Sequence, residues 1–120
     1  MVKAERAIHT AVDTYVTGFN RGDKVLLMQV LHPRFVSAGF FQGELQWDSA
    51  EEFAAFCAEA APDPDGPVPG WEIETLVISG QTAVAIVRDS WGSRRFRDCL
   101  TLLEDNGRWQ IVFKAFHSLE

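Results

Sequence analysis

The stretch that decides the fold is TAVAIVRDSWGSRRFRDCLTLLEDNGRWQIVFKAFHS, residues 82–118. Asn106-Gly107 is its strongest hairpin signal, because a tight two-residue turn needs positive φ at both of its central positions. Taking this pair as the turn places Asp105 opposite Arg108 in an antiparallel ladder. Gly92-Ser93 is a plausible turn of the same length, so the stretch predicts three consecutive antiparallel strands.

These registers divide the side chains between two faces of a sheet, because successive residues of a strand point to opposite sides. The mostly apolar face, expected to be the inner one, holds Ala83, Ala85, Val87, Asp89, Trp91, Arg94, Phe96, Asp98, Leu100, Leu102, Trp109, Ile111, Phe113, Ala115 and His117. The other face holds Arg88, Arg95, Arg97 and Lys114, together with Val84, Ile86, Cys99, Leu103, Val112 and Phe116. Asp89, Asp98 and His117 therefore gather at one end of the inner face.

The remainder of the chain predicts helices first and strands last, an α+β order. The expected elements are helices over 4–19 and 24–31 and a third helix that is capped by Asp48 or Ser49 and ends before Pro62. Strands are expected over 35–41, 44–47 and 71–79, and a loop over 62–70. Glu74 would face inward in the simplest register of the 71–79 strand. A β-bulge near Glu74–Thr75 avoids this and is therefore preferred.

Composition limits the classes of function. The chain has 120 residues, which indicates one domain over residues 1–120, and 47% of them are hydrophobic. A net charge of -6 argues against nucleic acid or an anionic membrane as partner. Neither a signal peptide nor a membrane-spanning run is visible, so we expect a cytoplasmic protein. Cys57, Cys99 and the histidines show no ligand spacing, so we expect reduced thiols, no metal and no cofactor.

The order of elements resembles the nuclear-transport-factor-2-like superfamily over essentially the whole chain, from two N-terminal helices and the Leu31-His32-Pro33 step to the final sheet. The segments FRDCLTLL, NGRWQIV and KAFH, which begin at Phe96, Asn106 and Lys114, are most similar to its SnoaL-like, putative lumazine-binding branch. The resemblance implies a cone, in which a strongly bent antiparallel sheet wraps around the N-terminal helices (a cystatin-like α+β barrel). It also implies an open-ended cavity and a homodimer formed through the outer face of the sheet.

Asp98 and His117 are the candidate catalytic residues. Asp98 lies diagonal to both Asp89 and His117 in the predicted registers, at about 7–8 Å between backbone positions. An apolar cup raises the pKa of a carboxyl, and an Asp–His pair can act as acid and base. The expected ligand-binding residues are Tyr15, Trp47, Phe53, Asp89, Phe96 and Phe113. Simpler alternatives are an ion pair of Asp89 with Arg94 and a structural Asp98–His117 hydrogen bond.

The sequence is compatible with two functions. The first is a small-molecule-binding cone, an isomerase-, cyclase- or dehydratase-like enzyme acting on a hydrophobic or ring-containing ligand. The alternative is a non-catalytic dimeric binding or scaffold module whose cavity is filled by its own aromatic side chains. Relatives of the ketosteroid isomerase type keep a carboxylate base on the first strand, where this sequence offers only Ser37. That isomerase mechanism is therefore disfavoured, unless Asp98 or Asp89 takes the role of the base.

Overall fold

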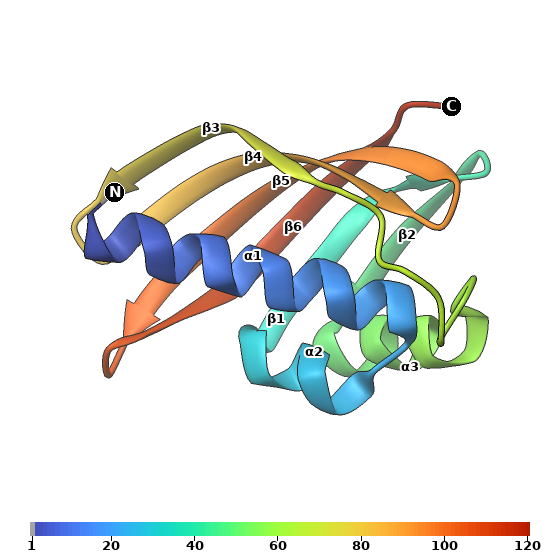
Figure 1. Ribbon diagram of the computed structural model, residues 1–120, viewed down its shortest axis with the longest axis horizontal. Helices are drawn as coiled ribbons and strands as arrows, with labels where there is room; N and C mark the ends of the chain where they lie inside the picture. The colour runs from blue at the N-terminus through green and yellow to red at the C-terminus, as the bar shows by residue number, and fades with distance from the viewer. Residues whose placement is uncertain (1) are drawn as a thin grey trace.

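A computed structural model describes residues 2–120, which form three helices and one six-stranded sheet (Figure 1). In chain order the elements are α1 Lys3–Arg21, α2 Lys24–Val30, β1 Leu31–Phe41, β2 Glu44–Ser49, α3 Ala50–Ala60, β3 Glu72–Ser79, β4 Thr82–Trp91, β5 Arg94–Asp105 and β6 Arg108–Ser118. The predicted α+β order is confirmed, and the 62–70 segment is the expected connection between α3 and β3.

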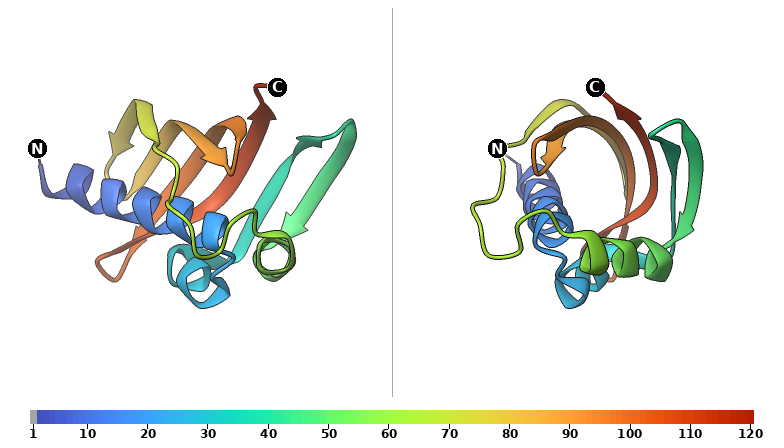
Figure 2. Two further views of the ribbon diagram at one scale, coloured as in Figure 1. Left: turned by 45° about the vertical axis from the view of Figure 1, so that its right-hand side comes forward. Right: turned by 90° about the vertical axis from the view of Figure 1, so that its right-hand side faces the viewer.

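The sheet has the strand order β2-β1-β6-β5-β4-β3 and curls around α1 without closing (Figure 2). This shape confirms the expected cone. Four of the five neighbouring pairs are antiparallel, whereas β1 and β6 run parallel. The sheet is therefore mixed rather than purely antiparallel, because β1 reaches the last strand through the long path of β2, α3 and the β3–β5 meander.

Helix ends follow from local side-chain chemistry. α1 ends at Gly22, which adopts a left-handed φ of 63° that favours glycine. The Asp23 side chain caps α2 by accepting from the backbone N–H of Leu26. Of the two predicted caps of α3, Ser49 is the one used, and it forms a reciprocal capping box with Glu52. These caps determine where α1 ends and where α2 and α3 begin.

The core lies between α1 and the concave face of the sheet. The α1 residues on the buried stripe are Ile8, Ala11, Val12, Tyr15, Val16 and Phe19, and the sheet contributes fully buried residues that include Ala85, Leu100, Leu102 and Ile111. Removing this apolar surface from water stabilises the fold at roughly 25 cal/mol per Å². The predicted amphipathic pattern of the first helix is therefore confirmed.

Two of the predicted registers are confirmed. In the β4–β5 hairpin, Asp89 pairs with Phe96 and Val87 pairs with Asp98. In the β3–β4 pair the register shifts between Ile73 and Thr75, which is the expected bulge. Both aspartates consequently lie on the inner face, on adjacent strands.

The predicted register of the last strand is wrong beyond Ile111. Leu102 pairs with Ile111 as expected, but the next pair joins Thr101 to Phe113, so that Val112 is an extra residue in β6. The pairing of β6 with β1 is irregular at the same place. This bulge leaves Val112 buried and reverses every later side chain of β6. The sequence prediction missed this bulge, because it assumed that side chains alternate between the two faces along the whole strand.

Candidate functional site

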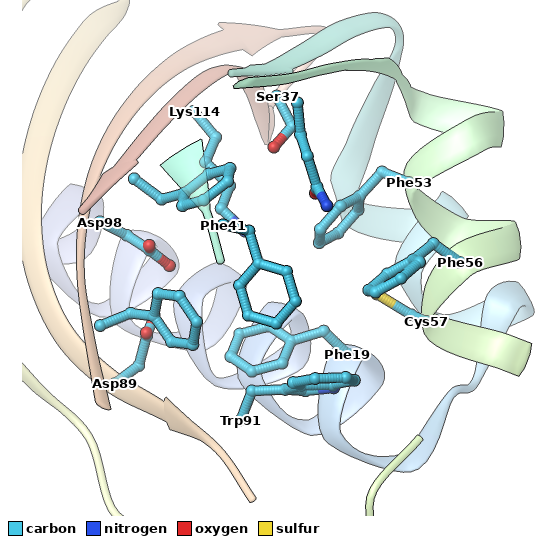
Figure 3. Close-up of a pocket in the computed structure, with 13 residues that line it drawn as sticks. Phe19, Ser37, Phe41, Phe53, Phe56, Cys57, Asp89, Trp91, Asp98 and Lys114 are labelled. Atoms are coloured by element: carbon cyan, nitrogen blue, oxygen red, sulfur yellow. The ribbon is translucent and has the colours of Figure 1, made fainter. Parts of the chain in front are cut away.

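A cavity of about 60 Å³ lies between the concave face of the sheet, the end of α1 and α3 (Figure 3). Its lining comprises the aromatic residues Phe19, Phe41, Phe53, Phe56, Trp91, Phe96 and Phe116 and the polar residues Ser37, Gln46, Cys57, Asp89, Asp98 and Lys114. Most of the wall is therefore apolar, and a few polar groups converge on it, the usual composition of a small-molecule site.

Asp89 of β4 and Asp98 of β5 form the acidic wall of the cavity (Figure 3). Their residues are only 4% and 1% exposed, and neither oxygen of Asp89 nor Oδ1 of Asp98 has a hydrogen-bond partner within residues 2–120. Burial, followed by the charge of Asp98, raises the pKa of Asp89 from 3.8 to about 10. The Asp89 carboxyl therefore keeps its proton near neutral pH.

Tyr15 orients the side chain of Asp98 through a hydrogen bond. Its hydroxyl donates a 2.9 Å hydrogen bond to Oδ2 of Asp98, and its side chain is completely buried on the inner stripe of α1. Burial and the nearby charges of Asp98 and Asp89 raise the pKa of Tyr15 well above 10.0. The phenol thus remains a donor, and it leaves Oδ1 of Asp98 free to face a ligand.

Lys114 is the cation of the cavity, and the bulge in β6 is the reason it points inward. Its ammonium nitrogen lies 4.3 Å from the ring centroid of Phe53, 5.1 Å from Phe116, 5.3 Å from Tyr15 and 5.7 Å from Phe19. Its charge lowers the pKa of Asp89, although burial outweighs this effect. Sequence reasoning placed Lys114 on the outer face. Val112 and Phe116 are the local signs that the opposite face of β6 is apolar as well.

The predicted site residues fall into two groups. Phe53, Asp89, Phe96 and Asp98 line the cavity, and Tyr15 contacts it through Asp98. The others point elsewhere: Trp47 is 70% exposed, Phe113 is 57% exposed, and His117 is exposed beside Arg97 on the outer face.

The interpretation of Asp98 and His117 as a pair is therefore wrong, whether catalytic or structural, because the two side chains lie on opposite faces of the sheet. The alternative ion pair of Asp89 with Arg94 is also absent. The guanidinium of Arg94 instead lies 5.3 Å from the ring centroid of Phe41.

Three further lining residues limit the chemistry. Ser37 is buried on β1 and confirms that this strand offers a hydroxyl rather than a carboxylate. Burial raises the pKa of Cys57 to about 11, so that its thiol is not a nucleophile near neutral pH. The buried indole N–H of Trp91 has no acceptor among the described residues.

Neither a metal site nor a membrane span is found within the described part of the chain. No group of three or more His, Cys, Asp or Glu side chains in residues 2–120 could hold a metal ion. No helix in this range is both long and apolar enough to cross a bilayer.

The bent sheet around α1 and the cavity inside it define the nuclear-transport-factor-2-like class, and solved structures of that class are similar. A protein of this class of unknown function from Silicibacter pomeroyi is 33% identical, with a TM-score of 0.89, over 98% of this chain and 99% of that one. Another, from Methylobacillus flagellatus, is 21% identical with a TM-score of 0.87, over 100% and 95%. A ketosteroid isomerase-like protein from Erwinia carotovora is 17% identical with a TM-score of 0.74, over 100% and 99%. The last two show the fold alone.

The family model described as putative lumazine-binding matches residues 3–117, and the chain belongs to this family. A comparison with curated proteins gives no match.

Proposed function

We propose that the cavity binds a small planar organic compound that carries a carbonyl oxygen. The observation that carries this proposal is the set of buried polar atoms without partners, namely both oxygens of Asp89, Oδ1 of Asp98 and Nε1 of Trp91. Leaving such a group unpaired costs about 1–3 kcal/mol, so native proteins rarely keep several of them in one place without a use. A ligand that carries both a carbonyl oxygen and an N–H or O–H group at its edge would satisfy them.

The two carboxyls would have different roles in binding, one as a hydrogen-bond donor and the other as an acceptor. Asp89 carries the proton and would donate it in a hydrogen bond to the carbonyl oxygen of the ligand. Asp98, fixed by Tyr15, would accept a proton or a hydrogen bond through Oδ1. An acid and an acceptor side by side suit proton transfer next to a carbonyl, as in isomerase-, cyclase- or dehydratase-like reactions. The aromatic wall would stack on the flat ring of such a ligand.

The alternative is a scaffold module with a cavity filled by its own side chains. The volume of about 60 Å³ favours it, because this space accepts only a few water molecules, and a ring would require aromatic side chains to move aside. The unpaired carboxyl oxygens oppose it, because a purely structural core gains nothing from them. Ligand binding is therefore the stronger of the two proposals, supported also by the family description.

The test is a titration of the ¹⁵N-labelled protein with 2,4-dioxopteridine and with 2-cyclohexenone, followed by NMR. We expect chemical-shift changes confined to cavity residues, including the indole N–H of Trp91. Asp89→Asn and Asp98→Asn should weaken binding about tenfold or more, because each removes a charge-assisted or acidic hydrogen bond. Asp65→Asn, in the exposed 62–70 loop, is the matched control and should bind like the wild type. An absence of shifts with both compounds would favour the scaffold.

A homodimer through the outer face of the sheet belongs to the same proposal. Val77 of β3, Val84 of β4 and Phe113 of β6 lie in one row across the sheet and are 58%, 44% and 57% exposed. Large exposed apolar patches commonly mark interfaces.

A cytoplasmic location is supported by Cys57 and Cys99, which are both free thiols.

A further inference from the structure

We propose that Lys114 makes the cavity selective for small ring compounds that carry a carboxylate or another anionic oxygen. This inference rests on the proposed function, because it assumes that the cavity takes a small molecule, and it adds the charge of that molecule. It starts from the position of one ammonium group inside an otherwise acidic and aromatic wall.

The Lys114 ammonium is held in place without an ionic partner. None of the ion pairs formed within residues 2–120 includes it. Four aromatic rings surround its nitrogen instead, at 4.3–5.7 Å from their centroids. Ring faces attract a cation but are poor hydrogen-bond acceptors, so the charge is positioned while its three N–H donors keep their capacity. A donor group fixed in advance loses little entropy on binding a ligand.

The acidic groups near this ammonium do not form a direct ion pair with it. Asp89 keeps its proton near neutral pH, and Asp98 bonds to Tyr15 rather than to Lys114. Asp48 and the Cys57 thiol also lie within reach of its charge, and Cys57 is protonated. Of these neighbours, none forms an ion pair with Lys114 within 4.0 Å.

The unused hydrogen-bonding capacity of the cavity is therefore biased towards donors. The donors are the three N–H groups of Lys114, the indole N–H of Trp91 and the acidic proton of Asp89. The unpaired acceptors are Oδ1 of Asp98 and the carbonyl oxygen of the protonated Asp89. Figure 3 shows Lys114 and Trp91 on opposite sides of the cavity, with the two aspartates along the wall between them. A flat ring with an anionic oxygen at the Lys114 end and a carbonyl or hydroxyl oxygen near Asp89 satisfies this arrangement.

The experiment compares benzoate with benzamide, which have the same shape and differ in charge. Dissociation constants are measured by NMR titration at pH 7.5, in low salt and again in 0.5 M NaCl. For the wild type we expect benzoate to bind about tenfold to a hundredfold more tightly than benzamide, the effect of one charge-assisted hydrogen bond. The preference should persist in part at high salt, because Lys114 is half-buried.

Three variants separate the role of Lys114 from general effects of charge. Lys114→Met keeps an unbranched apolar chain among the rings and should abolish the preference for benzoate while benzamide still binds. Lys114→Arg should retain part of it. Lys24→Met, which removes an exposed lysine paired with Glu51, should bind both ligands like the wild type. Thermal unfolding of each variant confirms that it is folded.

Each outcome decides between the two proposals. Equal affinities for benzoate and benzamide in the wild type, or an unchanged preference in Lys114→Met, would overturn the inference and leave the proposed small-molecule function standing. Binding of neither benzoate nor benzamide, together with no response to the neutral carbonyl compounds, would overturn both.

Discussion

Tyr15 and Asp98 are separated by 83 positions in the chain and are joined by a 2.9 Å hydrogen bond between the phenol and Oδ2 of the carboxyl. The bond connects α1 to β5 in the buried interior, and it orients the one carboxyl whose other oxygen is unpaired. α1 and β5 are thus joined by a polar contact next to the cavity, and mutation of either residue tests whether this contact forms.

Tyr15→Phe should lower the free energy of unfolding by about 1–3 kcal/mol, because it leaves Oδ2 of Asp98 buried without a donor. Urea denaturation measures the change. Asp98→Asn and the double variant complete a thermodynamic cycle, in which the two single effects should not add. Strict additivity would show that the two side chains do not interact in solution.

The stability of the protein should fall as the pH rises from about 5 to 9. An unfolded chain releases the Asp89 proton near 3.8, whereas burial and Asp98 keep the proton bound in the folded state up to about 10. Over this interval the folded state binds more protons than the unfolded state, so raising the pH favours unfolding, by at most about 1.4 kcal/mol per pH unit.

Asp89→Asn should flatten this dependence, and urea denaturation at several pH values measures it. Glu52, Glu74 and Glu120 have lowered pKa values, so they act below about 4.5 and do not disturb the comparison. Parallel curves for the wild type and Asp89→Asn would mean that Asp89 is ionised in the folded protein.

His117→Ala should change stability by no more than about 0.5 kcal/mol and leave ligand binding unaltered, because His117 is exposed on the outer face beside Arg97. The NMR titration described above serves as the measurement, with Asp98→Asn as the variant that does respond. A loss of binding in His117→Ala similar to that of Asp98→Asn would restore the unbulged register.

Gly39→Ala should destabilise the fold by about 1–3 kcal/mol, because a Cβ there would lie 2.6 Å from the carbonyl oxygen of Phe116 on the neighbouring strand. Gly70→Ala is the matched control, since nothing lies within 4 Å of its added Cβ. Thermal unfolding compares the two variants. Equal melting temperatures would contradict the close approach of β1 to β6.

Val84→Asp should convert a dimer into a monomer, because it places a charge in the exposed apolar row of the outer face. Light scattering coupled to size exclusion measures the mass. Val25→Asp, at a 73% exposed position on α2, is the control and should leave the mass unchanged. A wild-type protein that elutes as a monomer at micromolar concentration would remove the dimer from the proposal.

Local signals in the sequence were sufficient for most of the fold. The left-handed turn at Gly22, the Ser49 capping box and the hairpin at Gly92-Ser93 each depend on a few adjacent residues, and each is found where it was expected. The bulge in β3 was also predictable, because the regular register would have turned Glu74 inward and buried a charge. Conflicts of this kind reveal irregularities in a strand.

The bulge in β6 could not be predicted, because the regular and the bulged register both place apolar residues on the inner face. The regular register places Phe113, Ala115 and His117 inside, whereas the observed one places Lys114 and Phe116 there. An alternating pattern of apolar residues cannot choose between a buried histidine and a buried lysine. The choice depends on non-local packing, namely the aromatic rings from α1 and α3 that receive the Lys114 chain. Asp89 and Asp98 were found because they precede this point.

The extra residue at Val112 also determines how such a pocket can diversify. Loss of the bulge would turn Lys114 out of the cavity and His117 into it, without a substitution at either position. An insertion or deletion near the middle of this strand is therefore equivalent to several simultaneous substitutions. Related proteins could acquire different ionisable groups by slippage, at a position that no comparison of aligned pocket residues would mark.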